Sequence, residues 1–502
     1  MGNKVGYEMT ANLIEKFLKK PAREFTKNDI IHYIESNGIE MVNFRYQAED
    51  GKLKTLNFTI HSKQHLETIF SSGERVDGSS LFSFIEAGSS DLYVVPRFRT
   101  AFVNPFSDIP SVDLLCSFYS SDGKPLESAP EFILKKAHDA FKKETGMTFK
   151  ALGELEFYII SEKQTEYPAI DQKGYHASAP FVKHNDFRIH AMKLIAESGG
   201  KIKYGHSEVG NFTTDTELFE QHEIEFLPVD VEETSEQITV ARWIIRMLAY
   251  QYGITVSFSP KITVGKAGSG MHIHMLAEKN GKNVMIQKGK LSDTARKMIA
   301  GILDLASALT AFGNTIPTSY LRLVPHQEAP TSICWGDRNR SVLVRVPLGW
   351  VGASNMVSDA NPNEAEEKSD FTSKQTFELR SPDGSADVSF LLAGIVTAAL
   401  HGLKMPNALE LAQKLYIDVN IFKDENKARS EKLCHLPVSC SESADQLQAK
   451  RNHFEKYGDF PSGTIDAVIR TLKAHNDKGL SEKLYGKNDE IRKLVDKYLH
   501  WK

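Results

Sequence analysis

Glu154 and Glu156 stand one residue apart in a run of strand-forming residues that continues through Phe157 to Ile160. Side chains alternate between the two faces of a strand, so both carboxylates should lie on one face. Two negative charges so close together call for a cation. Acids at this spacing are also typical of the solvent-facing side of an ordinary strand, and the pair alone favours that interpretation.

Further segments carry side chains of the same kind: His206-Ser-Glu208-Val, Gln221-His-Glu223-Ile-Glu225, Gly268-Ser-Gly-Met-His272-Ile-His274 and Phe377-Glu378-Leu-Arg380. Each has an ordinary explanation alone, such as an interior histidine, a surface acid or a cross-strand ion pair. Together they favour one shared site. Carboxylates with an occasional imidazole are the ligands that Mg²⁺ or Mn²⁺ prefers over Zn²⁺, so we expect a site for several hard metal ions.

Arginines suited to an anionic substrate follow in the chain. Arg322 and Glu328 lie in one loop segment, and Arg338, Arg340 and Arg345 come shortly after it. Guanidinium groups bind carboxylate and phosphate through paired hydrogen bonds, and metals with arginines are the usual layout of phosphoryl transfer. Arginines on a solvated strand are the alternative, more plausible for Arg338 than for the other two. No Walker motif or kinase-type glycine loop occurs, so a nucleotide would have to bind in another way.

The elements that must position these residues divide the chain in two. With 502 residues, 41% hydrophobic and 25% charged, the chain should form more than one domain. Up to about Pro130 the pattern is a small mixed unit, in which Thr26 caps a helix and a hairpin follows. Beyond it, long helices alternate with strands, and the part after about Ser385 is mostly helical. Four local predictions are a hairpin of 41–46 with 53–60, a helix over 130–143, a helix capped by Thr234 with Gln237, and its end at Gly253.

Composition limits the partners and the compartment. The formal net charge of −4 is too small for a protein held to nucleic acid or an anionic membrane by its overall field. Four scattered cysteines form no C-x-x-C pair, and no segment approaches eighteen uncharged apolar residues. We therefore expect a cytoplasmic protein without nucleic-acid or membrane partners.

Nine short motifs occur in the order found in one known family: Asp77-Gly-Ser-Ser80, Glu154-Leu-Glu156-Phe, His206-Ser-Glu208-Val, Gln221-His-Glu223-Ile, Gly268-Ser-Gly-Met-His272-Ile-His274, Arg322-Leu-Val-Pro, Glu328-Ala-Pro, Asn339-Arg340-Ser and Glu378-Leu-Arg380. With these motifs the chain resembles glutamine synthetase, and its general pattern is similar to the bacterial type I-like enzymes. The match is collinear and spans essentially the whole chain.

The resemblance implies an α+β fold. An N-terminal extension (1–24) and a β-grasp domain (25–129) would precede a catalytic domain (130–502) with a curved antiparallel sheet flanked by helices. In this family neighbouring subunits complete each funnel-shaped site, and the implied assembly is a homo-oligomer, a dodecamer of two hexameric rings. The implied reaction joins ammonium to L-glutamate with ATP and two or more Mg²⁺ or Mn²⁺ ions.

The resemblance also assigns roles to residues. Glu156, Glu208 and Glu223 would hold one metal ion; Glu154, His272 and Glu378 would hold the second. Arg322 and Gly268 would bind the α-carboxylate of glutamate. His274, Arg340 and Arg345 would face ATP. The implied catalytic residues are Asp77, which would deprotonate ammonium, Glu328, which would close the site against water, Arg340, which would face ATP, and Arg380 beside the transferred phosphoryl group.

Several positions depart from the family pattern. Ala267 replaces an asparagine, Leu276 a serine near the nucleotide, and Thr376 an arginine that serves ATP, so that Lys374 is a candidate phosphate contact. Glu208 and Glu223 are unusually far apart in sequence, which predicts an enlarged loop over 210–220 and leaves Glu217, Glu220 or Glu225 as alternative ligands. Asn420-Ile421-Phe422 stands where some bacterial members carry an adenylylated tyrosine, so we expect no such modification.

Two other functions remain open at the level of sequence. A γ-glutamyl ligase for a larger amine would keep the metal and ATP residues and differ in the ammonium pocket. A non-catalytic structural or regulatory relative would be expected to lose metal ligands, and none is visibly lost. The presence of Asp77 and Glu328 favours ammonium as the substrate.

Overall fold

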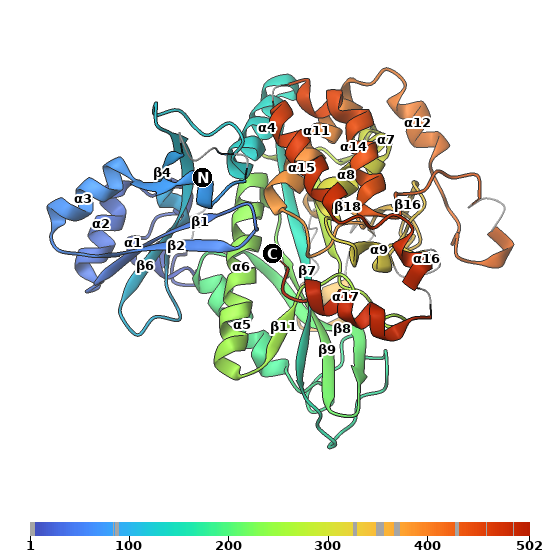
Figure 1. The fold of residues 1–502 in the computed structure, drawn as a ribbon, viewed down its shortest axis with the longest axis horizontal. Helices are drawn as coiled ribbons and strands as arrows, with labels where there is room; N and C mark the ends of the chain where they lie inside the picture. Colours follow the sequence, from blue (N-terminus) through green and yellow to red (C-terminus); the bar gives the residue numbers. More distant parts are fainter. Residues whose placement is uncertain are drawn as a thin grey trace.

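Two sheets, each with its own helices, make up the computed structural model (Figure 1). The structure describes residues 6–83, 85, 90–324, 329–347, 356–365, 372–426, 431–457, 459–484 and 486–501. The N-terminal sheet lies to one side in Figure 1, and the long strands of the second sheet run through the middle of the molecule. The α+β class predicted from sequence is confirmed.

The N-terminal sheet has the strand order β2-β1-β6-β4-β3, with β5 paired to β6. Its neighbours are antiparallel except β1 and β6, which run parallel. Thr26 forms a capping box with Asp29 at the start of α2, as predicted. The elements are α1 (Leu13–Leu18), α2 (Lys27–Ser36), β1 (Met41–Gln47), β2 (Leu53–Thr59), α3 (Lys63–Ser72), β3 (Glu74–Asp77), β4 (Asp91–Pro96), β5 (Phe102–Val103) and β6 (Ser111–Ser120).

The core of this N-terminal unit takes in a residue from the segment predicted as an extension. Ile14 on α1 is fully buried against the same cluster as Phe44 and Val94. Asn12 caps α1 by accepting from two backbone N–H groups. The first helix is therefore packed onto the domain that follows it, while the predicted domain boundaries stay predictions.

The second sheet has the order β16-β17-β18-β12-β7-β9-β8, with β10 and β11 on β7 and β13 on β12. Its pairs are antiparallel apart from β16 with β17. The strands are β7 (Thr148–Glu162), β8 (Ile202–Thr213), β9 (Glu217–Phe226), β10 (Val229–Asp230), β11 (Thr255–Ser257), β12 (Met271–Lys279), β13 (Lys282–Asn283), β16 (Trp335–Asp337), β17 (Val344–Val346) and β18 (Phe377–Leu379); β14 (Ile286–Gln287) and β15 (Lys290–Leu291) form a separate ribbon.

Helices cover this sheet and bury its apolar face. α6 packs on β7, and α11 contacts α4, α6, α7 and α8 at the centre of the helical layer. The helices are α4 (Pro130–Thr145), α5 (Asn185–Glu197), α6 (Val231–Tyr252), α7 (Asp293–Asp304), α8 (Ala306–Gly313), α9 (Ser319–Arg322), α10 (Met356–Ala360), α11 (Val388–Lys404), α12 (Ala408–Lys414), α14 (Cys440–Glu455), α15 (Ser462–Ala474), α16 (Leu480–Leu484) and α17 (Asn488–Tyr498). The predicted helical C-terminal part is thus confirmed.

The predicted cap of α6 is wrong. The helix begins at Val231, so Thr234 lies inside it, and the Thr234 hydroxyl donates 2.8 Å to the carbonyl of Ala151. Gln237 accepts from the backbone N–H of Lys201 instead of closing a capping box. Both side chains thus bond to residues outside the helix, Ala151 on β7 and Lys201 just before β8, although their spacing matched that of a capping box. The predicted end at Gly253 is correct, with φ +66°.

The enlarged loop predicted over 210–220 is also wrong. β8 continues to Thr213 and β9 begins at Glu217, so the extra residues lengthen a hairpin. Phe212 stacks on Phe219 with ring centroids 4.4 Å apart, and these cross-strand contacts hold the ribbon together.

Among the described residues, no single helix is long and apolar enough to cross a membrane. The pair α11 with α12 passes the same length and composition test only as two segments bent by 108°.

Candidate functional site

A cavity of about 1420 Å³ opens beside the strands of the second sheet. Its lining includes every predicted metal, substrate and nucleotide residue that the structure describes in this domain: Glu154, Glu156, Glu208, Glu223, Gly268, His272, His274, Arg322, Arg340, Arg345, Lys374, Glu378 and Arg380. Asp77 lies in the N-terminal domain and does not line this cavity. Glu328 falls outside the described residues.

The strand register brings these side chains together. His272 is opposite Glu154, which is opposite Glu225 on its other side. In the same way Glu156 faces Glu223. Two further cross-strand pairs are Arg345 with Glu378 and His274 with Glu378. Residues directly opposite in a sheet lie within contact distance, so strands distant in sequence supply one site.

A β-bulge positions Glu208. The β8–β9 register shifts between Ser207 and Asn211, because β8 contains extra residues at this point. Bulges redirect side chains, and Glu208 lines the cavity as a result. The structure also separates the alternative β9 acids. Glu220 accepts from the backbone N–H groups of Lys183 and His184 outside the cavity, and Glu217 is not among the lining residues.

Two glycines make room for charged groups. A Cβ atom on Gly270 would lie 2.6 Å from Arg322 Nη2, 3.1 Å from His272 Nε2 and 3.2 Å from Glu156 Oε1. On Gly268 it would lie 2.6 Å from the carbonyl oxygen of Pro260. The glycine-rich run therefore allows acid, imidazole and guanidinium groups to meet around its backbone.

The acids on β7, β8 and β9 repel one another. Burial, followed by repulsion from Glu208, raises the pKa of Glu156 to about 7, although nearby His272 and Arg322 oppose the shift. Burial and the surrounding acids Glu154, Glu156, Glu208 and Glu225 raise the pKa of Glu223 well above its ordinary value. This cluster holds more carboxylate than the neighbouring cations can neutralise.

Histidines neutralise the acids closer to β18. His272 Nδ1 lies 2.8 Å from one oxygen of Glu154, and His274 Nε2 lies 2.9 Å from the other. His274 Nε2 is also 2.7 Å from Glu378 Oε2. Burial alone would lower the pKa of His274, but Glu154 and Glu378 raise it to about 10. Burial would raise the pKa of Glu378, and His274 lowers it to about 2.

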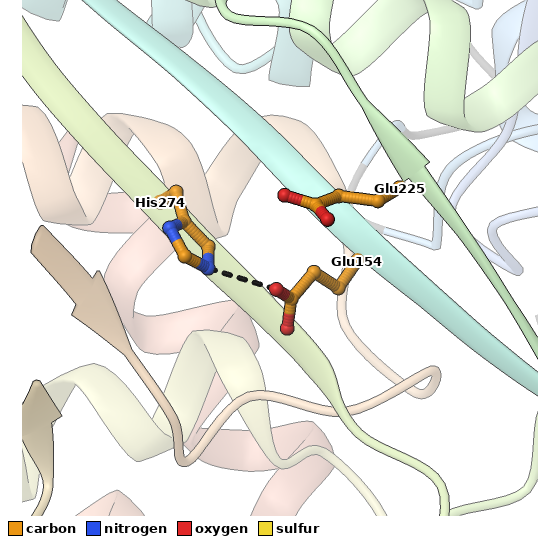
Figure 2. A group of neighbouring side chains, drawn as sticks. All are labelled: Glu154, Glu225 and His274. Atoms are coloured by element: carbon orange, nitrogen blue, oxygen red, sulfur yellow. Dashed lines mark hydrogen bonds and ion pairs between the residues drawn. The ribbon is translucent and has the colours of Figure 1, made fainter. Parts of the chain in front are cut away.

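Glu225 is the residue whose position the sequence left most open. Figure 2 shows its carboxylate directed toward Glu154 and His274. Lys203 Nζ donates 2.6 Å to Glu225 Oε1, while Oε2 is buried without a hydrogen-bond partner. The i, i+2 spacing of Glu225 from Glu223 was the signal available in the sequence. Lys203 lies on β8 outside the His206–Val209 motif, so the sequence gave no signal for its contact with Glu225.

Within the described part of the chain, two groups of side chains offer metal-ligand atoms within 4.8 Å of one another: Glu154 with Glu225 and His274, and His206 with Glu208 and Glu223. His206 was part of a motif but had no role assigned; its Nε2 lies 3.3 Å from Glu223 Oε1. The donors are carboxylates with imidazoles, the set that suits Mg²⁺ or Mn²⁺. The unpartnered oxygen of Glu225 and the mutual repulsion around Glu223 fit divalent cations.

The cations on the other walls are held by the backbone. The guanidinium of Arg322 is 5% exposed and donates to the carbonyls of Ser381, Pro382 and Arg380. These neutral partners orient the group and leave its charge for a ligand. Arg380 donates to the carbonyl of Arg340, and its Nε lies 3.2 Å from Glu378 Oε1.

The positions that depart from the family pattern have different surroundings. Thr376 lines the cavity, and its hydroxyl lies 3.0 Å from His274 Nδ1. Ala267 also lines the cavity, and its carbonyl accepts from Tyr158. Leu276 is 2% exposed within the hydrophobic core and does not line the cavity. Asn420 and Phe422 do line it.

Asp77 begins a short 3₁₀ turn on the exposed edge of the N-terminal sheet. Its carboxylate accepts from the Ser79 backbone N–H and from the hydroxyls of Ser79 and Ser80 at 2.7–3.0 Å. Hydrogen bonds from Ser79, Ser80 and Ser90 lower the pKa of Asp77. The side chain is therefore an ionised acceptor fixed by its own loop.

A small sheet domain followed by a sheet whose strands carry acids, histidines and arginines into one cavity defines a metal-dependent enzyme for anionic substrates. The family model described as the glutamine synthetase catalytic domain matches residues 127–467, and the glutamine synthetase β-grasp domain matches residues 38–121. The chain belongs to the glutamine synthetase family.

Individual relatives agree with the family. The chain is 30% identical over 456 residues to a glutamine synthetase from Clostridium saccharobutylicum, covering 88% of this chain and 94% of the relative. A glutamine synthetase from Pyrococcus furiosus is 31% identical over 396 residues, covering 78% and 82%.

Solved structures share the fold. A glutamine synthetase from Plasmodium falciparum has a TM-score of 0.72 at 19% identity, covering 92% of this chain and 97% of that one. A ligand-free structure of the protein named GmaS has a TM-score of 0.70 at 20% identity, covering 90% and 97%.

Proposed function

We propose that the protein joins ammonia to L-glutamate and forms L-glutamine, ADP and phosphate through γ-glutamyl phosphate. The main support is one cavity that combines a wall of carboxylates and imidazoles with a wall of arginines. Membership of the family supports ATP-dependent ligation of glutamate and ammonia in general. The choice of amine is the specific part of the proposal.

Glu156, Glu208 and Glu223 would hold one Mg²⁺ or Mn²⁺, and Glu154, His272 and Glu378 a second. Such ions supply charge neutralisation at phosphate oxygens. Glu225 and His206 lie close enough to these ligands to act as additional ligands of the two ions. The alternatives Glu217 and Glu220 are not proposed, because neither lines the cavity.

Arg322 would bind the α-carboxylate of glutamate, beside the open backbone of Gly268. Its three carbonyl partners support this role because they fix the guanidinium and do not neutralise it. Paired N–H groups held in one plane match a carboxylate.

Arg340, Arg345 and Lys374, together with His274, would contact ATP, and Arg380 would lie beside the transferred phosphoryl group. A γ-carboxylate oxygen of glutamate attacks the γ-phosphorus, and ADP leaves with its bond electrons. Arginines on this side would offset the negative charge that gathers in that step. Ammonia then attacks the acyl carbon, and phosphate leaves.

Asp77 would accept the proton that ammonium must lose before it can attack. Since Asp77 does not line the cavity of its own chain, the proposed reaction calls on Asp77 of a neighbouring subunit. A homo-oligomer with shared sites, proposed as a dodecamer of two hexameric rings, would bring it there. Glu328, proposed to close the site, lies outside the described residues.

Phosphate release from ATP, measured with glutamate and Mg²⁺, tests the proposal. We expect release that depends on ammonium and is much weaker with methylammonium, with polyamines or with no amine. Preference for methylammonium would overturn the choice of amine, and no release with any amine would indicate a non-catalytic relative.

Asp77→Ala gives a sharper test of the proton acceptor. General bases typically contribute about 10²–10⁴-fold, so we expect ammonium-dependent glutamine formation to fall by about 100-fold or more. ATP binding, measured by calorimetry, should stay nearly unchanged. Ser83→Ala, in the same loop region, is the matched control. Wild-type turnover in Asp77→Ala would contradict the assignment.

A further inference from the structure

A second cavity, of about 440 Å³, lies between the N-terminal domain and the helix α6. Its walls come from the β1–β2 hairpin, from one side of α6 and from the chain next to β11. In Figure 1 this hairpin reaches α6 close to the mark of the C-terminus. Nothing in the proposed reaction uses this cavity.

In the part of the chain that the structure describes, no acidic side chain lines it, and the basic ones are Lys52, Arg242, Arg246 and His500. Burial and repulsion between these basic groups lower the pKa values of two of them, Arg242 and His500. Burial, followed by repulsion from Arg246, lowers the pKa of Arg242 to about 10. Burial, Arg246 and Lys52 lower the pKa of His500. The cavity is therefore a concentrated positive region.

Arg242 carries a buried charge with only weak partners. It is 5% exposed and donates 3.2 Å to the carbonyl of Ala386 and 3.3 Å to the sulfur of Met271. Its Nε has no hydrogen-bond partner. The carboxylates of Asp387 and Asp383 act on it electrostatically, but no carboxylate among the described residues forms an ion pair with it. A cation buried without a charged partner costs folding free energy, and an anion bound in the cavity would offset that cost by pairing with it.

The rest of the lining is mainly apolar and aromatic, with Gln47, Thr239 and Thr255 as its polar members. Trp243 and Tyr250 lie on α6, and Leu53, Ile254 and Val256 complete the apolar surface. The volume falls within the usual range for small-molecule sites, which combine apolar walls with a few polar groups. Inorganic phosphate alone would leave these walls uncovered.

We propose that this cavity binds a small organic anion that carries an apolar group, with the anionic end on Arg242 and the apolar part against Trp243. Lys52 at the hairpin adds positive charge. The aromatic carboxylates are the simplest compounds with this chemistry.

Arg242 connects this cavity to the strand β12, which carries His272 and His274. Met271, which contacts Arg242, stands between Gly270, whose N–H donates 2.8 Å to Glu156, and His272, which contacts Glu154. An anion that draws the guanidinium toward itself changes the Met271 contact. Binding should therefore alter the affinity of the catalytic cavity for metal, and linkage requires the effect to be reciprocal.

Benzoate titrated into the full-length protein tests the site, with the catalytic cavity saturated by MgADP and glutamate and binding followed by ligand-observed NMR. Arg242→Met should weaken binding by about tenfold, the loss typical of a charged hydrogen bond. Lys52→Gln should weaken it less. Lys54→Gln is the matched control, because it removes the same charge from the same hairpin but does not line the cavity.

Benzyl alcohol, the neutral analogue, should bind wild type no better than it binds Arg242→Met. Equal benzoate affinity in wild type, Lys52→Gln and Arg242→Met would overturn the proposal, as would the absence of any benzoate binding. Lys52→Gln decides the matter if Arg242→Met does not fold.

Coupling is measured separately by titrating Mn²⁺ with and without saturating benzoate and following free Mn²⁺ by electron paramagnetic resonance. We expect a shift of the Mn²⁺ midpoint in wild type that is absent in Arg242→Met. An unchanged midpoint would overturn the coupling. Both experiments measure binding and not turnover, so their failure is distinct from failure of the proposed reaction.

Discussion

The two sheets of this protein bury carboxylates in opposite ways. In the N-terminal sheet, Asp113 is completely buried, and Arg45 Nε lies 2.7 Å from one of its oxygens. Asn43 and Asn104 donate to the same carboxylate at 2.6 Å and 3.1 Å. Asn57 in turn donates to Asn43, and the Arg45 guanidinium lies over the ring of Trp243. This acid is fully partnered by its own chain.

In the second sheet, Glu223 and Glu156 are nearly as buried but lie among other acids. Glu156 accepts from Gln221 and from the N–H of Gly270, both neutral donors. A buried carboxylate needs a hydrogen-bonded or charged partner, and here the chain does not supply enough of them. The difference separates an acid that holds the fold together from acids that await a cation.

The largest expected effect is a loss of folding stability in Asp113→Ala, which removes the fully partnered acid of the N-terminal sheet. Removing one partner of a buried ion pair typically costs about 3–5 kcal/mol, because Arg45 would be left buried without its counter-charge. Chemical unfolding of the variant measures the loss. Asp122→Ala, at an exposed acid of the same domain, is the control. A loss equal to that of the control would show that Asp113 is not structural.

Glu223→Gln should show the reverse pattern. We expect ammonium-dependent phosphate release to fall by about 100-fold or more, since metal-site partners are sensitive to single changes. The metal-free melting temperature should stay nearly the same, because burial and the surrounding acids raise the pKa of Glu223, so a neutral amide in its place removes no favourable charge interaction. Glu220→Gln, which changes an acid on the same strand outside the cavity, is the control and should bind metal as the wild type does. Equal loss of metal affinity in Glu220→Gln and Glu223→Gln would contradict the choice of Glu223.

Asp459 is an intermediate case that sharpens the comparison. It is 1% exposed, has a hydroxyl of Thr397 at 3.3 Å as its donor, and burial raises its pKa to about 6. Because the folded pKa lies above the unfolded value, stability is full below about pH 4 and is lost as pH rises through 6. Asp459→Asn should therefore gain roughly 2 kcal/mol at pH 8 and little at pH 4, measured by denaturant unfolding at both pH values. A gain independent of pH would contradict this origin.

The smallest expected effect concerns the division of the two metal ions. Glu154→Gln and Glu156→Gln should each weaken mainly one Mn²⁺ binding step, by about tenfold, because the two side chains have different partners. Calorimetric titration with Mn²⁺ separates the steps. Equal weakening of both steps by either variant would argue that the ions share these ligands.

The cavity side of this contrast could largely be predicted from the sequence, whereas the buried Asp113 of the N-terminal sheet was not. The i, i+2 acids, the histidines after a glycine run and the arginines in order placed the cavity, because strand periodicity fixes which face a side chain occupies. The α2 cap at Thr26 and the end of α6 at Gly253 also followed from local rules.

Other features depended on contacts that sequence spacing does not encode. The lengthened β8–β9 hairpin replaces the predicted loop, and the bulge beside Glu208 is a shift in the pairing of β8 with β9. Lys203 meets Glu225 only across that hairpin. Asp77 stands apart from the cavity because it belongs to a different sheet, which no local motif reports. Leu276 is buried in the core although its motif pointed to the nucleotide.

Gly270 has a consequence for any redesign of this cavity. Its α-carbon is itself a wall, since the guanidinium of Arg322, the ring of His272 and the carboxylate of Glu156 all close on the space that a β-carbon would need. The arginine proposed for the substrate and two side chains proposed for the metal ions thus pack around the same α-carbon. An engineer who wants another metal or another amino acid can change the surrounding side chains, but a side chain at this position would displace the Arg322 guanidinium and crowd His272 and Glu156.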